Sequence, residues 1–341
     1  MGVDLKHAVE SLPGAAKQVF GEDTRVRSLG VGRHGSGFGY VAVRNASLPV
    51  PLSGNVASVL PGNVQGIPLT FVDAHRDPAS LVKLPHSGPG SPSLASLVPE
   101  QTPQVPLVCG LQLENFDDDE RTGVIDDGHM IVGTLGCFVT ADGRKAMLSN
   151  NHVLAGENRG QNGHDRIMQP GNGEFSLDSQ AGTLNNFVVL RRSPDGASPG
   201  QGNVTFNDVD AAIALVRDGV AAKQRYLSSR QGVVAPNGTA APQVGDKVFK
   251  VGRTTGLTRG EITQVATVVG PVPYDPGPCW FQGTIVIEGD NGTMFSDHGD
   301  SGSAIVRTDG KIVGLLFAGN GQQTYGCPID AVLQLLNCTI P

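Results

Sequence analysis

From residue 128 to the C-terminus, short apolar runs alternate with turn residues along the chain. The runs include MIVGTLGCFVT, DAAIALV, GTIVIEG and KIVGLLFAG, and Gly, Pro, Asn or Asp residues separate nearly all of them. Many short strands at near-regular spacing are typical of antiparallel sandwiches and barrels. This part of the chain is therefore predicted to consist almost entirely of β-strands.

Helical periodicity is confined to the two ends of the chain. Leu5, Val9 and Leu12 recur at helical intervals, and the dipeptide at 13–14, Pro-Gly, predicts that a short helix is interrupted there. Near the C-terminus, IDAVLQLL places apolar residues on one face. This segment predicts a terminal helix of two turns that packs onto the preceding strands.

Changes in composition suggest where the chain divides. Residues 1–75 combine the helical start with two β-like runs around a glycine-rich turn, which predicts a small α+β accessory unit. Residues 76–108 are rich in Pro, Ser and Gly and predict a linker or an extended wrap. The accessory segment holds no candidate catalytic set, so it either restricts substrate access or gives structural support.

Overall composition excludes several classes of protein. The 341 residues include 47 Gly and 23 Pro but only 5% aromatic residues, which excludes a helical bundle or a coiled coil. The net charge is −7 and no basic stripe is present, so nucleic acid is not the expected partner. No apolar run approaches the ~20 residues of a membrane span, and the N-terminus lacks a signal-peptide pattern. We expect a soluble, cytoplasmic protein without a membrane partner.

The cysteines support that expectation. There are five, at scattered positions and without a CxxC pair: Cys109, Cys137, Cys279, Cys327 and Cys338. An odd, scattered set is better explained by reduced thiols in a cytoplasm than by a disulfide framework or a zinc site. No metal site is predicted.

Two other motifs are better explained by structure than by ligand binding. Residues 30–35 fit GxGxxG, but a β-like run follows them where a dinucleotide site needs a helix, so a hairpin turn is predicted. The acidic run at 117–120 lacks the spacing of an EF-hand and is predicted to be a solvated loop.

Three segments each place a catalytic residue type where a strand meets a loop. LSNNHVLAG carries His152, NDVDAAIALV carries Asp208 and Asp210, and HGDSGSAIV carries Ser301. A serine hydroxyl needs an imidazole to accept its proton and a carboxylate to hold that imidazole in one tautomer. The three segments supply these groups in the order His, Asp, Ser.

Glycines flank the candidate nucleophile. Gly299 and Gly302 allow a tight turn that aims the backbone amides of Gly299 and Ser301 at one point. Such a pair of amides forms an oxyanion hole.

With these motifs in place, the chain resembles trypsin-like, chymotrypsin-fold serine peptidases. More narrowly, KVGRTTGLTRGEI, GDSGSAIV and VGLLFAG resemble bacterial relatives of the plant narrow-leaf trypsin-like peptidases. The resemblance covers about residues 128–336 and implies two antiparallel Greek-key β-barrels. The first, 109–235, would carry His152 and the acid, and the second, 236–341, would carry Ser301 and the C-terminal helix. The family pattern favours Asp210 over Asp208 as the acid.

The chain departs from that family in two respects. Val153 follows His152 where secreted relatives often have a cysteine, so that disulfide is absent. Activated zymogens in the family also place a new N-terminus against the Asp before the serine. The Ile-Val-Gly at 131–133 lies too close to His152 for this and is predicted to be part of a strand. Asp300 is therefore expected to have another internal donor.

The resemblance also suggests a substrate pocket. Phe295 stands six residues before the nucleophile, where the base of the pocket lies in the trypsin-like pattern. Phe317, Ala318 and Gly319 would add apolar walls and small residues where a substrate backbone could lie. An apolar pocket without a buried acid predicts a preference for small or medium apolar residues on the acyl side of the cleaved bond.

The function predicted from the sequence is that of a serine endopeptidase that acts through an acyl-enzyme intermediate. Its partner would be a protein or peptide substrate, no cofactor is required, and a homo-oligomer is left open. Two alternatives remain at this point: a catalytically silent scaffold with a protease fold, and a small-ester hydrolase that uses the same residues.

Overall fold

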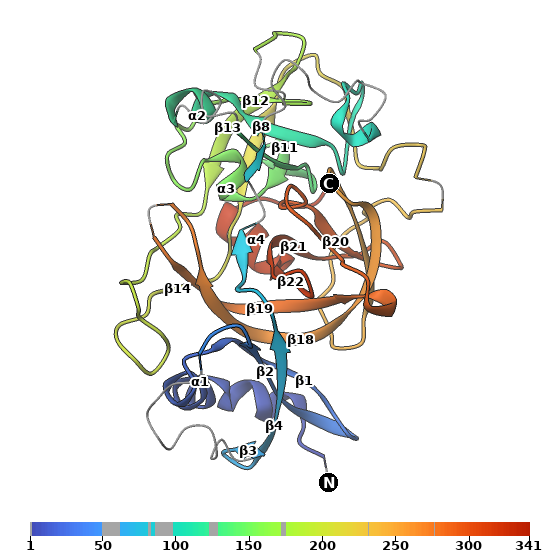
Figure 1. Ribbon diagram of the computed structural model, residues 1–341. Helices are drawn as coiled ribbons and strands as arrows, with labels where there is room; N and C mark the ends of the chain where they lie inside the picture. The colour runs from blue at the N-terminus through green and yellow to red at the C-terminus, as the bar shows by residue number, and fades with distance from the viewer. Residues whose placement is uncertain are drawn as a thin grey trace.

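The computed structural model of the chain describes residues 2–49, 62–80, 83–85, 98–122, 129–171, 175–230, 232–275 and 277–341. The α-helices in these residues are α1 (Leu5–Glu22), α2 (Phe116–Thr122), α3 (Asn151–Leu154) and α4 (Ile329–Leu336). Two short 3-10 helices are η2 (Pro99–Gln101) and η3 (Asp290–Gly292). In Figure 1 the blue N-terminal unit, the orange and red barrel and the green barrel are stacked in that order.

The first barrel is a sheet with the order β10-β11-β15-β13-β12-β8-β9. Its strands are β8 (Gln112–Asn115), β9 (His129–Thr134), β10 (Cys137–Ala141), β11 (Arg144–Ser149), β12 (Arg166–Met168), β13 (Gln180–Phe187) and β15 (Ala212–Val216). Asp142 and Gly143 join β10 to β11 with φ of 48° and 74°. A two-residue hairpin turn needs such positive values, and Asp-Gly supplies them readily.

The second barrel closes into a ring because β18 pairs with β17 on one side and with β19 on the other. Its strands are β17 (Lys247–Gly252), β18 (Gly256–Val272), β19 (Cys279–Gly289), β20 (Ala304–Arg307), β21 (Ile312–Gly319) and β22 (Gln323–Pro328). The C-terminal helix α4 follows β22 and buries Ile329, Val332 and Leu336. The prediction of a mainly β chain with two barrels and a terminal helix is confirmed.

The N-terminal unit extends the sheet of the second barrel. Its strands are β1 (Val26–His34), β2 (Gly37–Asn45), β3 (Asn63–Val64) and β4 (Ile67–Ala74), and β1 pairs with the second half of β18. β18 can reach both partners because it is 17 residues long. The predicted accessory unit is thus continuous with the second barrel through backbone hydrogen bonds.

Five short strands complete the fold. They are β5 (Ala79–Ser80), β6 (Lys83–Pro85), β7 (Leu107–Val108), β14 (Phe206–Asn207) and β16 (Ala222–Lys223). β14 pairs with β19, β16 pairs with β7, β5 pairs with β21, and β6 pairs with β9. The segment predicted as a linker or wrap therefore contacts both barrels.

Helix α1 differs from the sequence prediction. It runs without interruption through Pro13, and the Asp4 side chain caps it by accepting a hydrogen bond from His7 N at 2.9 Å. Proline removes one intrahelical hydrogen bond. Leu12, Ala16 and Phe20 are buried on either side of that position, and their packing against the sheet outweighs the lost bond.

The acidic run also differs from its prediction. Residues 117–120 belong to helix α2, not to a solvated loop, and Asp118 and Asp119 are buried. Arg159 and Arg121 pair with Asp118 at 3.0 Å. Most of this burial depends on residues far along the chain, which the local pattern does not reveal.

The cysteine prediction is confirmed by the structure. All five thiols are free and buried. Burial raises the pKa of Cys109 and of Cys279 to about 12, so these thiols are protonated at neutral pH. No helix in the described residues is long and apolar enough to span a membrane.

Candidate active site

His152 is held at the end of β11 by the two asparagines that precede it. Asn150 donates a hydrogen bond to the carbonyl of Asp210 at 2.7 Å, and Asn151 donates to the carbonyl of Val188 at 2.7 Å. These bonds fix the short helix α3, which begins at Asn151. The His152 side chain is completely buried as a result.

Asp210 lies directly against His152. Strand β15 pairs with β11 so that Ala212 is opposite Ser149, which brings the residues just before β15 next to the residues just after β11. The carboxylate Oδ2 of Asp210 contacts Nδ1 of His152, and Oδ1 accepts a hydrogen bond from His152 N at 3.3 Å. A carboxylate in this position holds the imidazole with Nε2 turned away from it.

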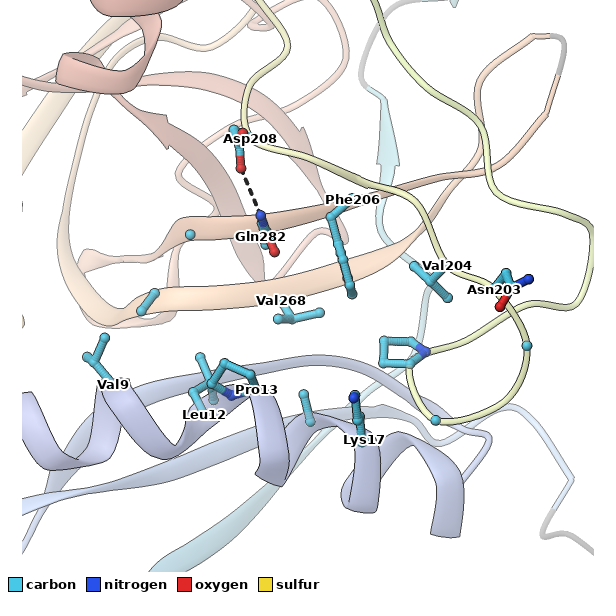
Figure 2. A pocket seen from close by; sticks show the side chains of 16 residues that line it. Val9, Leu12, Pro13, Lys17, Asn203, Val204, Phe206, Asp208, Val268 and Gln282 are labelled. Atoms are coloured by element: carbon cyan, nitrogen blue, oxygen red, sulfur yellow. Dashed lines mark hydrogen bonds between the residues drawn. The ribbon is translucent and has the colours of Figure 1, made fainter.

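Asp208, the alternative acid, lies elsewhere. Figure 2 shows its side chain beside Gln282, whose Nε2 donates to Oδ1 of Asp208 at 3.0 Å. Both residues line a cavity of about 720 Å³ between α1 and strands β18 and β19. None of the three candidate catalytic residues lines this cavity.

The turn that carries Ser301 is anchored by a buried ion pair. Nζ of Lys250 lies 3.2 Å from Oδ2 of Asp300, and both side chains are fully buried. Thr254 N and Asp297 N also donate to this carboxylate, at 2.9 and 3.0 Å. Burial lowers the pKa of Lys250, and the negative charge of Asp300 opposes that shift. Lys250 thus supplies the internal donor that the sequence requires for Asp300.

Glycine is needed at both predicted positions of this turn. Gly299 has φ of 92°, and a Cβ there would lie 2.5 Å from Oγ1 of Thr254. Gly302 has φ of 88°, and a Cβ there would lie 2.0 Å from Oγ of Ser149. Any side chain would therefore displace the turn from the first barrel. The oxyanion hole assigned to the amides of Gly299 and Ser301 stays a prediction.

Ser301 and His152 meet across strand β9. The Ser301 carbonyl accepts a hydrogen bond from Thr134 N at 2.8 Å. A Cβ built on Gly133 would lie 2.9 Å from that carbonyl and 2.4 Å from a methyl group of Val153, the residue after His152. The three predicted residues thus gather at the junction of the two barrels.

The gathered site is closed to solvent. Ser301, His152 and Asp210 are all 0% exposed. Nε2 of His152 is buried and has no hydrogen-bond partner among the described residues. A base with a buried, unpartnered nitrogen is held ready for a proton, but a substrate cannot reach it in this conformation.

The tip of the β18–β19 hairpin contacts the His-Asp pair, and no sequence motif predicted it. The hydroxyl of Tyr274 donates to Oδ2 of Asp210 at 2.7 Å, and its ring lies 5.8 Å from the ring of His152. Asp275 N donates to the carboxylate of Glu157, which follows α3. Burial raises the pKa of Glu157 to about 7, although the nearby His152 opposes the shift.

The predicted pocket residues are all buried, but they belong to different parts of the core. Phe295 packs with the N-terminal unit and β18, whereas Phe317 packs against Phe281 with ring centroids 4.5 Å apart. Ala318 and Gly319 end strand β21 and pair with β5. The preference for apolar substrates therefore stays a prediction.

The architecture defines the class of protein. The closed ring of the second barrel, the curved sheet of the first and the helix after the last strand make a chymotrypsin-like two-barrel fold. A family model of the Nal1 C-terminal domain matches residues 234–326. No curated protein matches the chain.

Several solved structures are similar to the chain. Chymotrypsin from Cellulomonas bogoriensis is 20% identical, and the match covers 61% of this chain and 90% of that one with a TM-score of 0.41. Nocardiopsis protease is 18% identical, with 68% and 97% covered and a TM-score of 0.44. Thermobifida fusca protease A is 17% identical, with 61% and 90% covered and a TM-score of 0.41.

Proposed function

We propose that this chain is a serine endopeptidase in which Ser301 is the nucleophile, His152 the general base and Asp210 the residue that orients the base. The observation that carries the proposal is the buried contact between Nδ1 of His152 and the Asp210 carboxylate, beside the turn that bears Ser301. Ser301 would attack the peptide carbonyl while His152 accepts its proton. His152 would then protonate the leaving amine, and water would hydrolyse the acyl-enzyme.

Labelling with a fluorophosphonate probe tests this function directly, because the probe forms a covalent bond only with an activated serine. We expect labelling of the wild-type chain at Ser301 and none in Ser301→Ala or His152→Ala. Turnover of a peptide library should fall by about 10⁴ to 10⁶ in both variants while the circular dichroism spectrum stays unchanged.

Three results would contradict the proposal in different ways. A folded wild-type chain that the probe never labels would favour the silent scaffold. Labelling with ester hydrolysis but no peptide cleavage would favour the small-ester hydrolase. Full peptide cleavage by Ser301→Ala would exclude this nucleophile.

A further inference from the structure

Strand β5 pairs with the end of β21 that follows the nucleophile turn. Ala79 lies opposite Gly319 and Ser80 opposite Ala318, in antiparallel register. Strand β21 is tied to the nucleophile turn, because Gly302 N donates to the Leu316 carbonyl at 2.9 Å. The backbone of β5 therefore lies where Ala318 and Gly319 were predicted to receive the acyl side of a substrate.

Strand β6 pairs with β9 on the other side of Ser301. Lys83 lies opposite Ile131 and Pro85 opposite His129, again in antiparallel register. Two residues further along β9, Gly133 approaches the Ser301 carbonyl, and Thr134 N donates to that carbonyl. Ser301 is thus bracketed by the strands that bind β5 and β6.

The connection between β5 and β6 is short. Ser80 and Lys83 are three residues apart, a separation that an extended chain spans with at most about 11 Å. In Figure 1 the cyan part of the chain that follows β4 runs up the front of the molecule from the N-terminal unit toward the green barrel. One short stretch of chain therefore passes from the β21 edge to the β9 edge at the junction that holds Ser301.

The direction of this stretch is that of a substrate. In acyl transfer from a peptide bond, the part that becomes the acyl group is N-terminal to the bond, and the leaving amine is C-terminal. The chain enters at β21, on the predicted acyl side, and leaves along β9. Both of its pairings are antiparallel, the way in which an extended peptide adds to an exposed sheet edge.

We propose that the stretch from Ala79 to Pro85 is a built-in peptide ligand that occupies the substrate cleft and keeps the enzyme closed. This inference rests on the proposed peptidase function and identifies the occupant of its cleft. A tethered segment competes at an effective concentration in the millimolar range, so it excludes ordinary protein substrates until it is displaced. It also accounts for a triad that is assembled but 0% exposed.

The test compares the full wild-type chain with the double variant Ala79→Pro/Ser80→Pro. Proline has no N–H group, so the double variant cannot donate hydrogen bonds from β5 to β21. Loss of one or two backbone hydrogen bonds should raise the rate of fluorophosphonate labelling at Ser301 by about tenfold or more. Lys83→Pro/Leu84→Pro should produce a similar rise by releasing β6.

Arg76→Pro is the matched control, because Arg76 lies in the same connection, is exposed, and is outside β5 and β6. Its labelling rate should stay within about twofold of the wild-type rate. Hydrogen exchange of the Ala318 and Gly319 amides provides a readout that does not depend on catalysis. Exchange should accelerate in Ala79→Pro/Ser80→Pro and stay unchanged in Arg76→Pro.

The outcomes separate this inference from the proposed function. Labelling at the wild-type rate in the double variant, with faster exchange at Ala318 and Gly319, would overturn the inference and leave the peptidase intact. Absence of labelling in every chain, with the same faster exchange, would count against the peptidase while the pairing of β5 stands. Cleavage of the wild-type chain between Ser80 and Lys83, absent in Ser301→Ala, would support the inference.

Discussion

Each barrel buries a carboxylate, and the two barrels neutralise it by different means. In the second barrel, Asp300 is buried beside the ammonium group of Lys250 and accepts several backbone hydrogen bonds. In the first barrel, Asp119 is buried beside Glu114, another carboxyl group. Burial and the charge of Glu114 raise the pKa of Asp119 to about 9. A bound proton, not a lysine, therefore neutralises this side chain at neutral pH.

The difference shows how the cost of burying a charge depends on the partner. A buried ion pair keeps its charges over the whole physiological range, because neither partner titrates easily beside the other. A buried pair of carboxyl groups keeps its proton only below the raised pKa. The turn that carries Ser301 is thus anchored independently of pH, whereas the region around α2 is not.

The largest expected effect comes from removing the cation in the second barrel. Lys250→Met leaves Asp300 as a buried charge without its counterion, which should lower the free energy of unfolding by about 3–5 kcal/mol. Urea denaturation at pH 7 measures the change. Labelling of Ser301 should fall as well, because Asp300 precedes the nucleophile.

Lys247→Met is the matched control for that experiment. Lys247 lies on the same strand and pairs with Glu261 at 2.7 Å, but its side chain is 59% exposed. The expected change is within about 0.5 kcal/mol. Equal losses of stability in the two variants would show that the Lys250–Asp300 pair has no special role.

The pH dependence of stability tests the carboxyl pair of the first barrel. The folded-state pKa of Asp119 is about 9, above its ordinary value of 3.8, so the folded chain holds a proton that the unfolded chain releases. Stability is then fully present below about pH 4 and falls as the pH rises toward 9. We expect a loss of about 1–2 kcal/mol between pH 6 and pH 8, below the limit of about 1.4 kcal/mol per pH unit for one group.

Asp119→Asn should flatten this part of the stability curve, because an amide cannot release the proton. Asp118→Asn is the comparison: Asp118 pairs with Arg121 and Arg159, so its loss should destabilise the chain at every pH in the series. Urea denaturation of the three chains at pH 6, 7 and 8 measures both effects. The same pH slope in wild type and Asp119→Asn would remove the carboxyl pair as its source.

The smallest expected effect concerns a third buried carboxylate, Asp210, which is served by hydrogen bonds from neutral or titratable groups. Tyr274→Phe removes the hydroxyl that donates to Asp210 at 2.7 Å but keeps the ring. A hydrogen bond to a charged group contributes about 1.5–3 kcal/mol. We expect kcat on a peptide substrate to fall by about tenfold with KM nearly unchanged.

Tyr226→Phe provides the control for Tyr274→Phe. Tyr226 is also buried, but its hydroxyl has no hydrogen-bond partner among the described residues. Its removal should leave kcat within about twofold of the wild-type value. A larger loss in Tyr226→Phe than in Tyr274→Phe would argue that general packing, not the bond to Asp210, sets the rate.

The sequence predicted the parts of the site that depend on local pattern. His152 and Ser301 stand in short motifs whose neighbours, the asparagines and glycines, have a direct structural purpose, and the structure gathers them as the motifs suggest. Lys250 and Tyr274 could not be found in this way. Each reaches its carboxylate from a segment distant in sequence, through a pairing that only the folded barrel creates.

The same limit explains the two incorrect predictions. Pro13 is a local signal to end a helix, but burial of one face of α1 against the sheet overrides it. The acidic run of α2 is a local signal for solvent, but Arg159 and Arg166 reach it from more than 35 residues away. Tertiary contacts decided both outcomes.

The length of β18 has a consequence for how this protein could have been assembled or dismantled. The N-terminal unit ends where the sequence changes composition, yet its hydrogen bonds continue into β18 without a break. A chain that began near Val108 would leave the second half of β18 as a bare edge and would uncover apolar residues such as Val265 and Val268. Bare edges of this kind recruit other strands and lead to aggregation. Loss of the N-terminal segment would therefore turn a self-contained peptidase into one that must find a partner strand to stay in solution.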